Sequence, residues 1–83
     1  MTLHYTTKEQ CPCCSFYTLD SDFDICPVCF WQHDPDQEQD PHAEGANAMT
    51  LYEARNKYRQ IGACGEHLKH YTRPPLDEER QRP

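Results

Sequence analysis

The chain has 83 residues, enough for one domain, and only 36% of them are hydrophobic, so an apolar core alone gives it little stability. Its formal net charge of −6 argues against direct binding to nucleic-acid phosphates and suits a basic protein partner better. No stretch approaches the roughly 20 apolar residues of a membrane span, and the N-terminus lacks a signal-peptide pattern, so we expect a cytoplasmic protein.

Short strands are expected in the first third of the chain. Residues 3–7 could form one strand, and residues 16–19 and 23–25 read as two more on either side of Asp20-Ser21-Asp22. That tripeptide is rich in turn-forming residues but lacks the Asn-Gly or Asp-Gly signal of the tightest hairpins. We therefore predict a hairpin with a loose turn.

The six cysteines offer a second source of stability. Six cysteines could form three disulfides in any of fifteen patterns, but disulfides belong to oxidising compartments, whereas paired cysteines in a cytoplasmic chain indicate a metal. Cys11 with Cys14 and Cys26 with Cys29 form two C-P-x-C pairs. Two thiolates three residues apart on a tight turn supply two corners of a tetrahedron, so these four residues are the predicted metal ligands.

Zinc is the expected metal, with iron as the alternative. Closed sites of four thiolates are typical of structural zinc, and a rubredoxin-like iron site uses the same ligands. Rubredoxin-like turns usually carry glycine after the second cysteine of each pair. Here those positions are Ser15 and Phe30, which favours zinc.

The remaining cysteines and the histidines receive weaker interpretations. Cys13 would be a free thiol beside the metal, either a small turn residue or else a reactive thiol or an alternative ligand, and Cys64 reads as a buried structural thiol. A second metal site made of Cys64, His67 and His70 is a minor alternative. His4, His33 and His42 have no partner pattern and are expected to be solvated.

The stretch after the second cysteine pair is acidic. Residues 34–49 carry a net charge of −5, and residues 34–45 contain two prolines and one apolar residue, Ala43, so we predict a loop. Just before it, Phe30 reads as a core residue, whereas Trp31 could be either core or an exposed interface anchor. The candidate partner-binding residues are Trp31, Asp34, Asp36, Glu38 and Asp40.

A helix is predicted over residues 51–61. Thr50 and Glu53 have the spacing of a capping box, and Gly62 provides a C-terminal stop. Apolar residues recur at helical spacing and define the core face: Leu51, Ala54, Tyr58 and Ile61.

The chain after this helix is expected to contribute less. Residues 64–71 could return as a strand beside the cysteine pairs. From Arg73 onward prolines and charges leave nothing to bury, so residues 73–83 are predicted to be a disordered tail after one zinc-binding domain of residues 1–72.

Taken together, these elements predict a small α+β fold stapled by a metal. It would combine a zinc-ribbon or rubredoxin-like hairpin carrying the four cysteines with one α-helix at about residues 51–61.

The chain resembles the bacterial cysteine-rich CPCC family. The resemblance lies in Cys11-Pro12-Cys13-Cys14 and residues 25–31, followed by Gly45-Ala46-Asn47, residues 51–55 and Gly62-Ala63-Cys64, in that order. It implies a zinc-ribbon or rubredoxin-like lobe with a helix. It also implies an immunity protein that binds and neutralises a cognate polymorphic toxin, in many cases a nuclease.

Three functions remain open from the sequence. The first is an immunity protein whose acidic surface meets a basic toxin domain, and the second is a zinc-ribbon adaptor for protein or nucleic acid. Electron transfer through iron is the third and weakest. An enzyme is not expected, because a closed four-cysteine site leaves no open position for a substrate.

Overall fold

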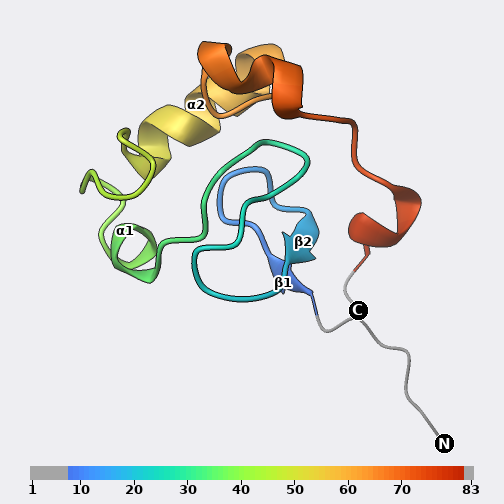
Figure 1. The fold of residues 1–83 in the computed structure, drawn as a ribbon, viewed down its shortest axis with the longest axis horizontal. Helices are drawn as coiled ribbons and strands as arrows, with labels where there is room; N and C mark the ends of the chain where they lie inside the picture. The colour runs from blue at the N-terminus through green and yellow to red at the C-terminus, as the bar shows by residue number, and fades with distance from the viewer. Residues whose placement is uncertain (1–7, 82–83) are drawn as a thin grey trace, which may run out of the picture.

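The computed structural model describes residues 8–81, in which the chain forms two short strands, two α-helices and two 3-10 helices. In chain order these are β1 (Glu9–Gln10), β2 (Tyr17–Leu19), α1 (Pro35–Gln39), α2 (Leu51–Ile61), η1 (Glu66–Tyr71) and η2 (Asp77–Glu79). The helical elements form an arc around the blue-to-green segment that carries both cysteine pairs (Figure 1). The hairpin, the helices and the buried four-cysteine cluster confirm the predicted class of fold. The strand expected at residues 3–7 lies outside the described residues.

The observed hairpin encloses the first cysteine pair. β1 and β2 pair antiparallel, with Glu9 opposite Leu19 and a register irregularity at the next residue. The predicted pairing of residues 16–19 with 23–25 is wrong. The Asp24 carboxylate accepts hydrogen bonds from the Asp20 and Ile25 amides, which closes a local turn. The chain then pairs forward, through an isolated antiparallel bridge between Ile25 and Gln32, around the second cysteine pair.

The predicted acidic loop contains a helix, α1, which the sequence analysis missed. The side chain of Asp34 accepts hydrogen bonds from the Asp36 and Gln37 amides and caps the helix N-terminus. Pro35 follows at the first helical position, where its missing N–H costs nothing. Five residues without an apolar stripe give no helical periodicity, so only the capping pattern could have revealed this helix.

The helix predicted over residues 51–61 is confirmed as α2. Thr50 and Glu53 form the expected capping box, and Gly62 ends the helix in the left-handed conformation with φ 80°. Leu51 and Ala54 are buried and Tyr58 packs against the core from its edge, whereas Ile61, also predicted for this face, is half-buried and lies outside the core. The capping pattern and apolar spacing therefore located both ends and the core face of this helix.

The chain after α2 forms two 3-10 helices, and the strand expected in residues 64–71 is not among its elements. Residues 64–71 contain the 3-10 helix η1, with no strand among the described residues of this stretch. Within residues 73–81, Arg73 makes two hydrogen bonds to Glu79, at 2.8 and 2.7 Å, and so ties η2 to the chain before it. This ion pair, rather than apolar burial, gives the segment local structure. The boundary proposed at residue 72 stays a prediction.

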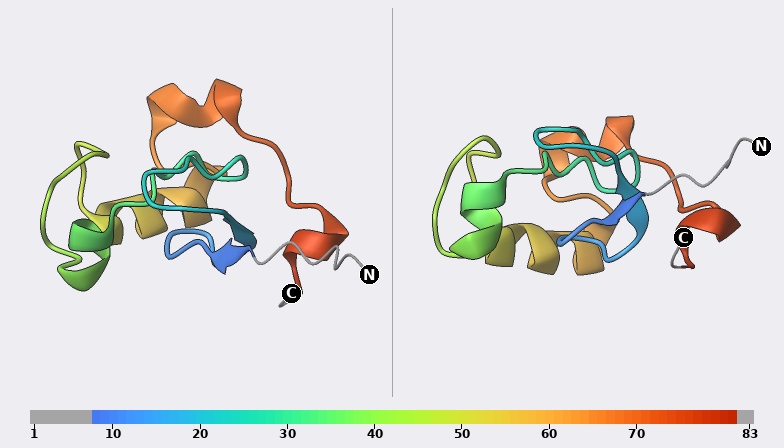
Figure 2. Two further views of the ribbon diagram at one scale, coloured as in Figure 1. Left: turned by 60° about the horizontal axis from the view of Figure 1, so that its bottom comes forward. Right: turned by 90° about the horizontal axis from the view of Figure 1, so that it is seen from below.

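The core is small and sulfur-rich. Its largest apolar side chains are those of Trp31, Leu19, Leu51 and Val28, and all six cysteines are buried with them. The two further views show α2 and η1 packed against the loops that carry the cysteines (Figure 2). Among residues 8–81, no helix has the length and apolar character that crossing a membrane requires.

Candidate metal centre

The two cysteine pairs form backbone turns, here called knuckles, that match bond for bond. In the first knuckle, the Cys11 amide donates to the Phe16 carbonyl and the Ser15 amide donates to the Cys11 carbonyl, both at 2.8 Å. In the second, Cys26 donates to Trp31 at 2.9 Å and accepts from Phe30 at 2.8 Å. The repeated C-P-x-C motif therefore folds twice into the same turn.

Each knuckle holds its fifth residue in the left-handed region. Ser15 has φ 75° and Phe30 has φ 70°. These are the positions at which the sequence analysis noted the absence of glycine. A side chain in this conformation costs about 1 to 2 kcal/mol. The knuckle geometry is thus kept without glycine, which indicates that the contacts made by the cysteines outweigh the strain.

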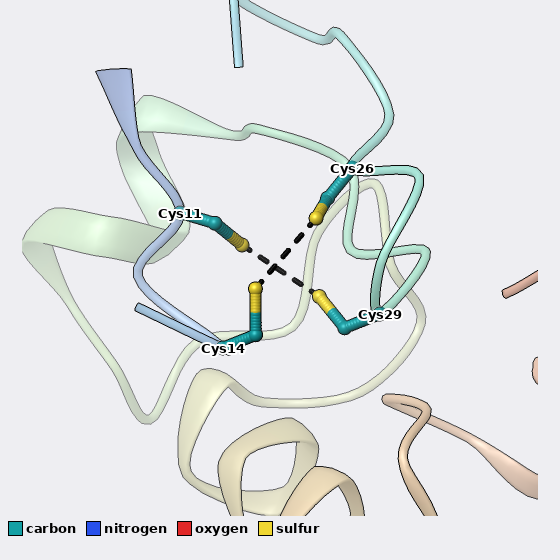
Figure 3. A group of neighbouring side chains, drawn as sticks. All are labelled: Cys11, Cys14, Cys26 and Cys29. Carbon is teal, nitrogen blue, oxygen red and sulfur yellow. Dashed lines mark hydrogen bonds between the residues drawn. The ribbon is translucent and has the colours of Figure 1, made fainter. Parts of the chain in front are cut away.

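The four predicted ligands converge on one point. The sulfur atoms of Cys11, Cys14, Cys26 and Cys29 all lie within 4.8 Å of one another, and all four residues are buried. Cys11 faces Cys29 at 3.6 Å and Cys14 faces Cys26 at 3.7 Å, as Figure 3 shows. Four sulfurs about 2.3 Å from a central zinc would be separated by about 3.8 Å at tetrahedral angles. The arrangement therefore fits one metal ion bound by four thiolates.

Hydrogen bonds to sulfur surround Cys26 most fully. The Thr18 hydroxyl donates to Cys26 Sγ at 3.0 Å, and the Val28 amide lies 3.4 Å from it. Hydrogen bonds from the Cys11, Cys14 and Cys29 thiols, together with that from Thr18, hold the pKa of Cys26 well below its usual range. Donors that stabilise a thiolate here would also fix the orientation of a metal-bound sulfur.

Distant parts of the chain hold both knuckles in place. Arg55 of α2 donates through Nε to the carbonyl of Pro12 at 2.8 Å. The Cys64 amide donates to the Cys29 carbonyl at 2.9 Å, and the Arg73 amide donates to Pro27 at 3.2 Å. Each knuckle is thus tied to a later segment of the chain by way of its backbone carbonyls, and the ligand geometry depends on the whole fold.

Cys13 and Cys64 are buried but stand outside the four-sulfur group. Cys14, and not Cys13, joins Cys11 in that group, which is the register that the sequence analysis favoured. Cys64 is 2% exposed, and burial raises the pKa of its thiol to about 12. Its environment fits the expected structural thiol. No second cluster with His67 and His70 forms in the part of the chain that the structure describes.

The candidate partner-binding residues divide into buried and exposed groups. Trp31 is 0% exposed, so it is a core residue, and the alternative of an exposed anchor is wrong. Asp34 is buried as well, and Glu38 is half-buried. Only Asp36 and Asp40 of the five face solvent freely.

Glu38 links three buried residues that precede α1: Trp31, His33 and Asp34. Its Oε2 accepts hydrogen bonds from Trp31 Nε1 at 3.2 Å and from the Asp34 amide at 3.0 Å. The same oxygen lies 2.7 Å from Nδ1 of His33. One carboxylate therefore satisfies three groups at the start of α1.

A second organised centre, missed from the sequence, surrounds α1. We call Asp34, Gln37, Gly45 and Asn47 the polar hub. The Gln37 amide donates to the Ala43 and Met49 carbonyls and accepts from both the backbone and the side chain of Asn47. Gly45 leaves space for this packing, because an added Cβ would lie 2.6 Å from Asp34 Oδ2. Gly45-Ala46-Asn47 had been noted without a role, and the spacing alone could not supply one.

His33 is the other site residue that the sequence analysis misjudged. It is 7% exposed rather than solvated, and its ring nitrogens face Glu38 at 2.7 Å and Glu9 at 3.2 Å. Burial opposes the charged imidazolium, but the hydrogen bonds and charges of Glu38 and Glu9 outweigh it and raise the pKa of His33 above 6.5. His4 lies outside the described residues, and His42 is exposed as expected.

The fold and the site define a class of protein: a small α+β protein whose two cysteine knuckles enclose four buried thiols placed to hold a metal ion. The chain belongs to the family described as Cysteine-rich CPCC, whose model matches residues 9–79. The match includes both knuckles, the polar hub and all of η2. No curated protein matches the chain.

Proposed function

We propose that the four-cysteine centre binds a structural zinc ion. Four thiolates fill a tetrahedron, so a bound ion keeps no open position for a substrate, and the protein is accordingly not an enzyme at this site. The burial of all four ligands supports this, since solvent has no direct path to the ion. Zinc is favoured over iron because all-cysteine closed sites are its commonest structural use. Elemental analysis of the purified protein tests this: one zinc per chain is expected, and one iron would overturn it.

On this scaffold, we propose that the protein is an immunity protein that binds and neutralises a basic toxin domain. The observation that carries the proposal is the distribution of charge. Between residues 9 and 54 the chain has ten acidic residues and no lysine or arginine. Seven of these are exposed: Glu9, Asp20, Asp22, Asp36, Asp40, Glu44 and Glu53. Such a surface attracts a basic groove of the kind that nucleases use for phosphates.

The internal contacts of α1 determine which acidic residues can test this proposal. Asp34 caps α1 and Glu38 binds three groups, so reversing either charge would disrupt the fold. Asp36, Asp40 and Glu44 are exposed and lie in or just after α1. These three are the appropriate positions for charge reversal.

The experiment compares two charge variants of equal net charge by binding kinetics. Asp36→Lys, Asp40→Lys and Glu44→Lys together should slow association with the proposed basic toxin domain about tenfold at low salt, with little effect on dissociation. The control combines Asp77→Lys and Glu78→Lys with Gln60→Lys and Gln81→Lys, at positions that are also exposed, so the net charge change is identical. Equal association rates for the two variants would remove the acidic surface around α1 from the binding site.

The alternative of a zinc-ribbon adaptor is separated by the same proteins. If the wild-type protein fails to bind the toxin domain but binds a nucleic acid or an unrelated protein, the immunity function is overturned. The acidic N-terminal part makes nucleic acid the less favoured of these two ligands.

A further inference from the structure

Exposed apolar residues gather beside the second knuckle. Phe23 is 54% exposed, Ile25 is 42% exposed and Tyr71 is 64% exposed. Tyr71 stacks on Phe30 with ring centroids 5.1 Å apart, so η1 carries an aromatic ring onto the knuckle. Three of the large apolar side chains that the fold leaves exposed are therefore close to one stretch of backbone. Exposed apolar residues that are scattered singly need no explanation, but a group of them does.

Ile25 and Phe30 line a hollow of about 200 Å³. Ile25, Phe30 and Gln32 form one side of it, and the loop after α1 and η1 form the others; the lining residues outside the knuckle are Ala46, Asn47, His67 and Leu68. Phe23 stands next to the hollow, because the Gln32 side chain donates to its carbonyl at 3.1 Å. The knuckle loop and η1 lie beside each other in both views of Figure 2.

Phe23 is an unusual residue for its position. Its φ of 63° is in the left-handed region, which glycine and asparagine occupy at lower cost than a bulky aromatic residue. At Phe30 the same strain is accompanied by partial burial, but more than half of Phe23 faces solvent. Strained residues of this kind cluster at functional sites, including sites that hold a ligand.

Four carboxylates are neighbours in the chain of Phe23 or of residues that line the hollow. Asp22 and Asp24 enclose Phe23 in the chain, Glu44 precedes the loop of residues 46–47, and Glu66 begins η1. The one lysine beside the lining residues, Lys69, is already used, since its Nζ donates to the Ile61 carbonyl at the end of α2. The hollow thus joins apolar side chains, those of Ile25, Phe30 and Leu68, with polar ones, and carboxylates stand close to it in the chain.

We propose that this hollow is the surface on which a basic protein partner docks, by placing one apolar side chain between Ile25, Phe30 and Leu68 while its lysines or arginines face the flanking carboxylates. The proposal rests on the proposed function and adds the contact surface to it. Buried apolar anchors hold a complex together, whereas charges at the edge mainly speed its formation. Trp31 cannot serve as this anchor because it is buried in the core.

Two synthetic pentapeptides and amide chemical shifts of the zinc-loaded protein test the proposal. One peptide has leucine between two pairs of lysines, and the other has serine in place of leucine. The leucine peptide should shift the amides of Ile25, Phe30 and Leu68 and bind about tenfold more tightly than the serine peptide. Ile25→Ser and Phe23→Asn should each remove that preference, and asparagine tolerates the backbone conformation at residue 23. Leu76→Ser, which removes a similarly exposed apolar side chain outside the hollow, should retain it.

The contrary outcomes separate this proposal from the proposed function. Equal binding of both peptides would show attraction by charge alone; it would overturn the docking surface and leave an acidic immunity protein in place. Shifts at other residues, or a preference that survives Ile25→Ser and Phe23→Asn, would also overturn it. Shifts at the same amides on raising the protein concentration without peptide would assign the hollow to a second copy of the chain instead.

Discussion

The four-cysteine centre and the polar hub fix neighbouring parts of the chain by different means. In the centre, four thiols meet across 3.6 and 3.7 Å and fit an ion that would hold two knuckles together. In the hub, one buried amide, that of Gln37, joins α1 to the loop that follows it, and Asp34 and Gly45 complete the packing. Neither region has a long strand or helix or a large apolar core.

The difference lies in what each region requires from outside the chain. The centre needs a metal and deprotonated sulfur, so chelators and acid should open it. The hub is complete in the folded chain, since Gln37 satisfies its amide with groups of the same protein. Losing the ion should therefore affect the whole fold, whereas losing one hub contact should weaken the fold without releasing the ion.

The largest expected effect is that of removing the metal. A strong chelator should unfold the protein, because structural zinc in small domains supplies about 10 to 16 kcal/mol of binding free energy to the folded state. Circular dichroism and metal content, followed together, measure this. Each ligand replaced singly by serine, Cys11, Cys14, Cys26 or Cys29, should cause the same loss.

Cys13→Ser and Cys64→Ser are the matched controls for the ligand variants, because both thiols are buried near the centre but outside the four-sulfur group. Both variants should keep one metal per chain. If Cys13→Ser released the metal while Cys14→Ser kept it, the assignment of the first knuckle would be wrong. A chelated protein with unchanged circular dichroism would show that the hub and core suffice without the metal.

The same contrast explains how much of the molecule the sequence could reveal. The knuckles were predictable because their ligands stand at fixed short spacings that the turn geometry requires, and α2 because its capping box and apolar spacing are local. The hub was not, because Gln37 meets Asn47 ten residues away with no periodic pattern. The composition of residues 34–45 accordingly predicted a charged loop, although Asp34 caps the N-terminus of α1.

The burial of His33 and Trp31 was unpredictable for a related reason. Both side chains make hydrogen bonds to Glu38, a residue of the segment predicted as a loop, whose side chain reaches back from α1 toward them. Likewise, the predicted pairing of residues 16–19 with 23–25 was wrong because the Asp24 carboxylate closes a local turn where that hairpin was expected. Contacts that depend on another element being in place first leave no trace in local composition.

The next largest effect is expected from the amide at the centre of the hub. Gln37→Ala should lower the free energy of unfolding by about 3 kcal/mol, because it leaves the Ala43 and Met49 carbonyls and the Asn47 backbone amide without these partners. Gln39→Ala, on the exposed side of the same helix, should change it by less than about 0.5 kcal/mol. Urea unfolding with metal content measured alongside checks both. Loss of metal from the folded Gln37→Ala protein would show that the two regions are not independent.

A smaller effect should follow from the cap of α1. Asp34→Ala removes the acceptor for the Asp36, Gln37 and Ala46 amides and should cost about 1 to 2 kcal/mol, whereas Asp36→Ala should cost little. Hydrogen bonds, first that from Ala46, lower the pKa of Asp34 below 3.8. Its contribution is therefore present above about pH 4 and lost as the pH falls through the lower, folded-state value. Equal unfolding free energies for the two variants would contradict the capping role.

The smallest effect concerns His33, and it runs in the opposite direction with pH. The ring faces the carboxylates of Glu9 on β1 and Glu38 on α1, and that of Asp22 in the turn at 3.7 Å. The charge of Asp34 also interacts with that of His33. Only the imidazolium can donate from both nitrogens at once. Because the folded pKa lies above 6.5, this contribution is fully present below pH 6.5 and is lost as the pH rises through the folded value.

Comparison with His33→Gln separates the contribution of the His33 charge from that of the metal centre. The metal affinity of the centre rises with pH because the thiols must lose protons. In zinc-saturated protein, the free-energy difference between wild type and His33→Gln should be larger at pH 6 than at pH 9, as measured by urea unfolding. His42→Gln, at an exposed histidine, should show no such change. A difference that stays constant across this range would mean that His33 acts as a neutral packing residue. The pairing of Glu9 with Glu38 across the ring would then have no electrostatic role.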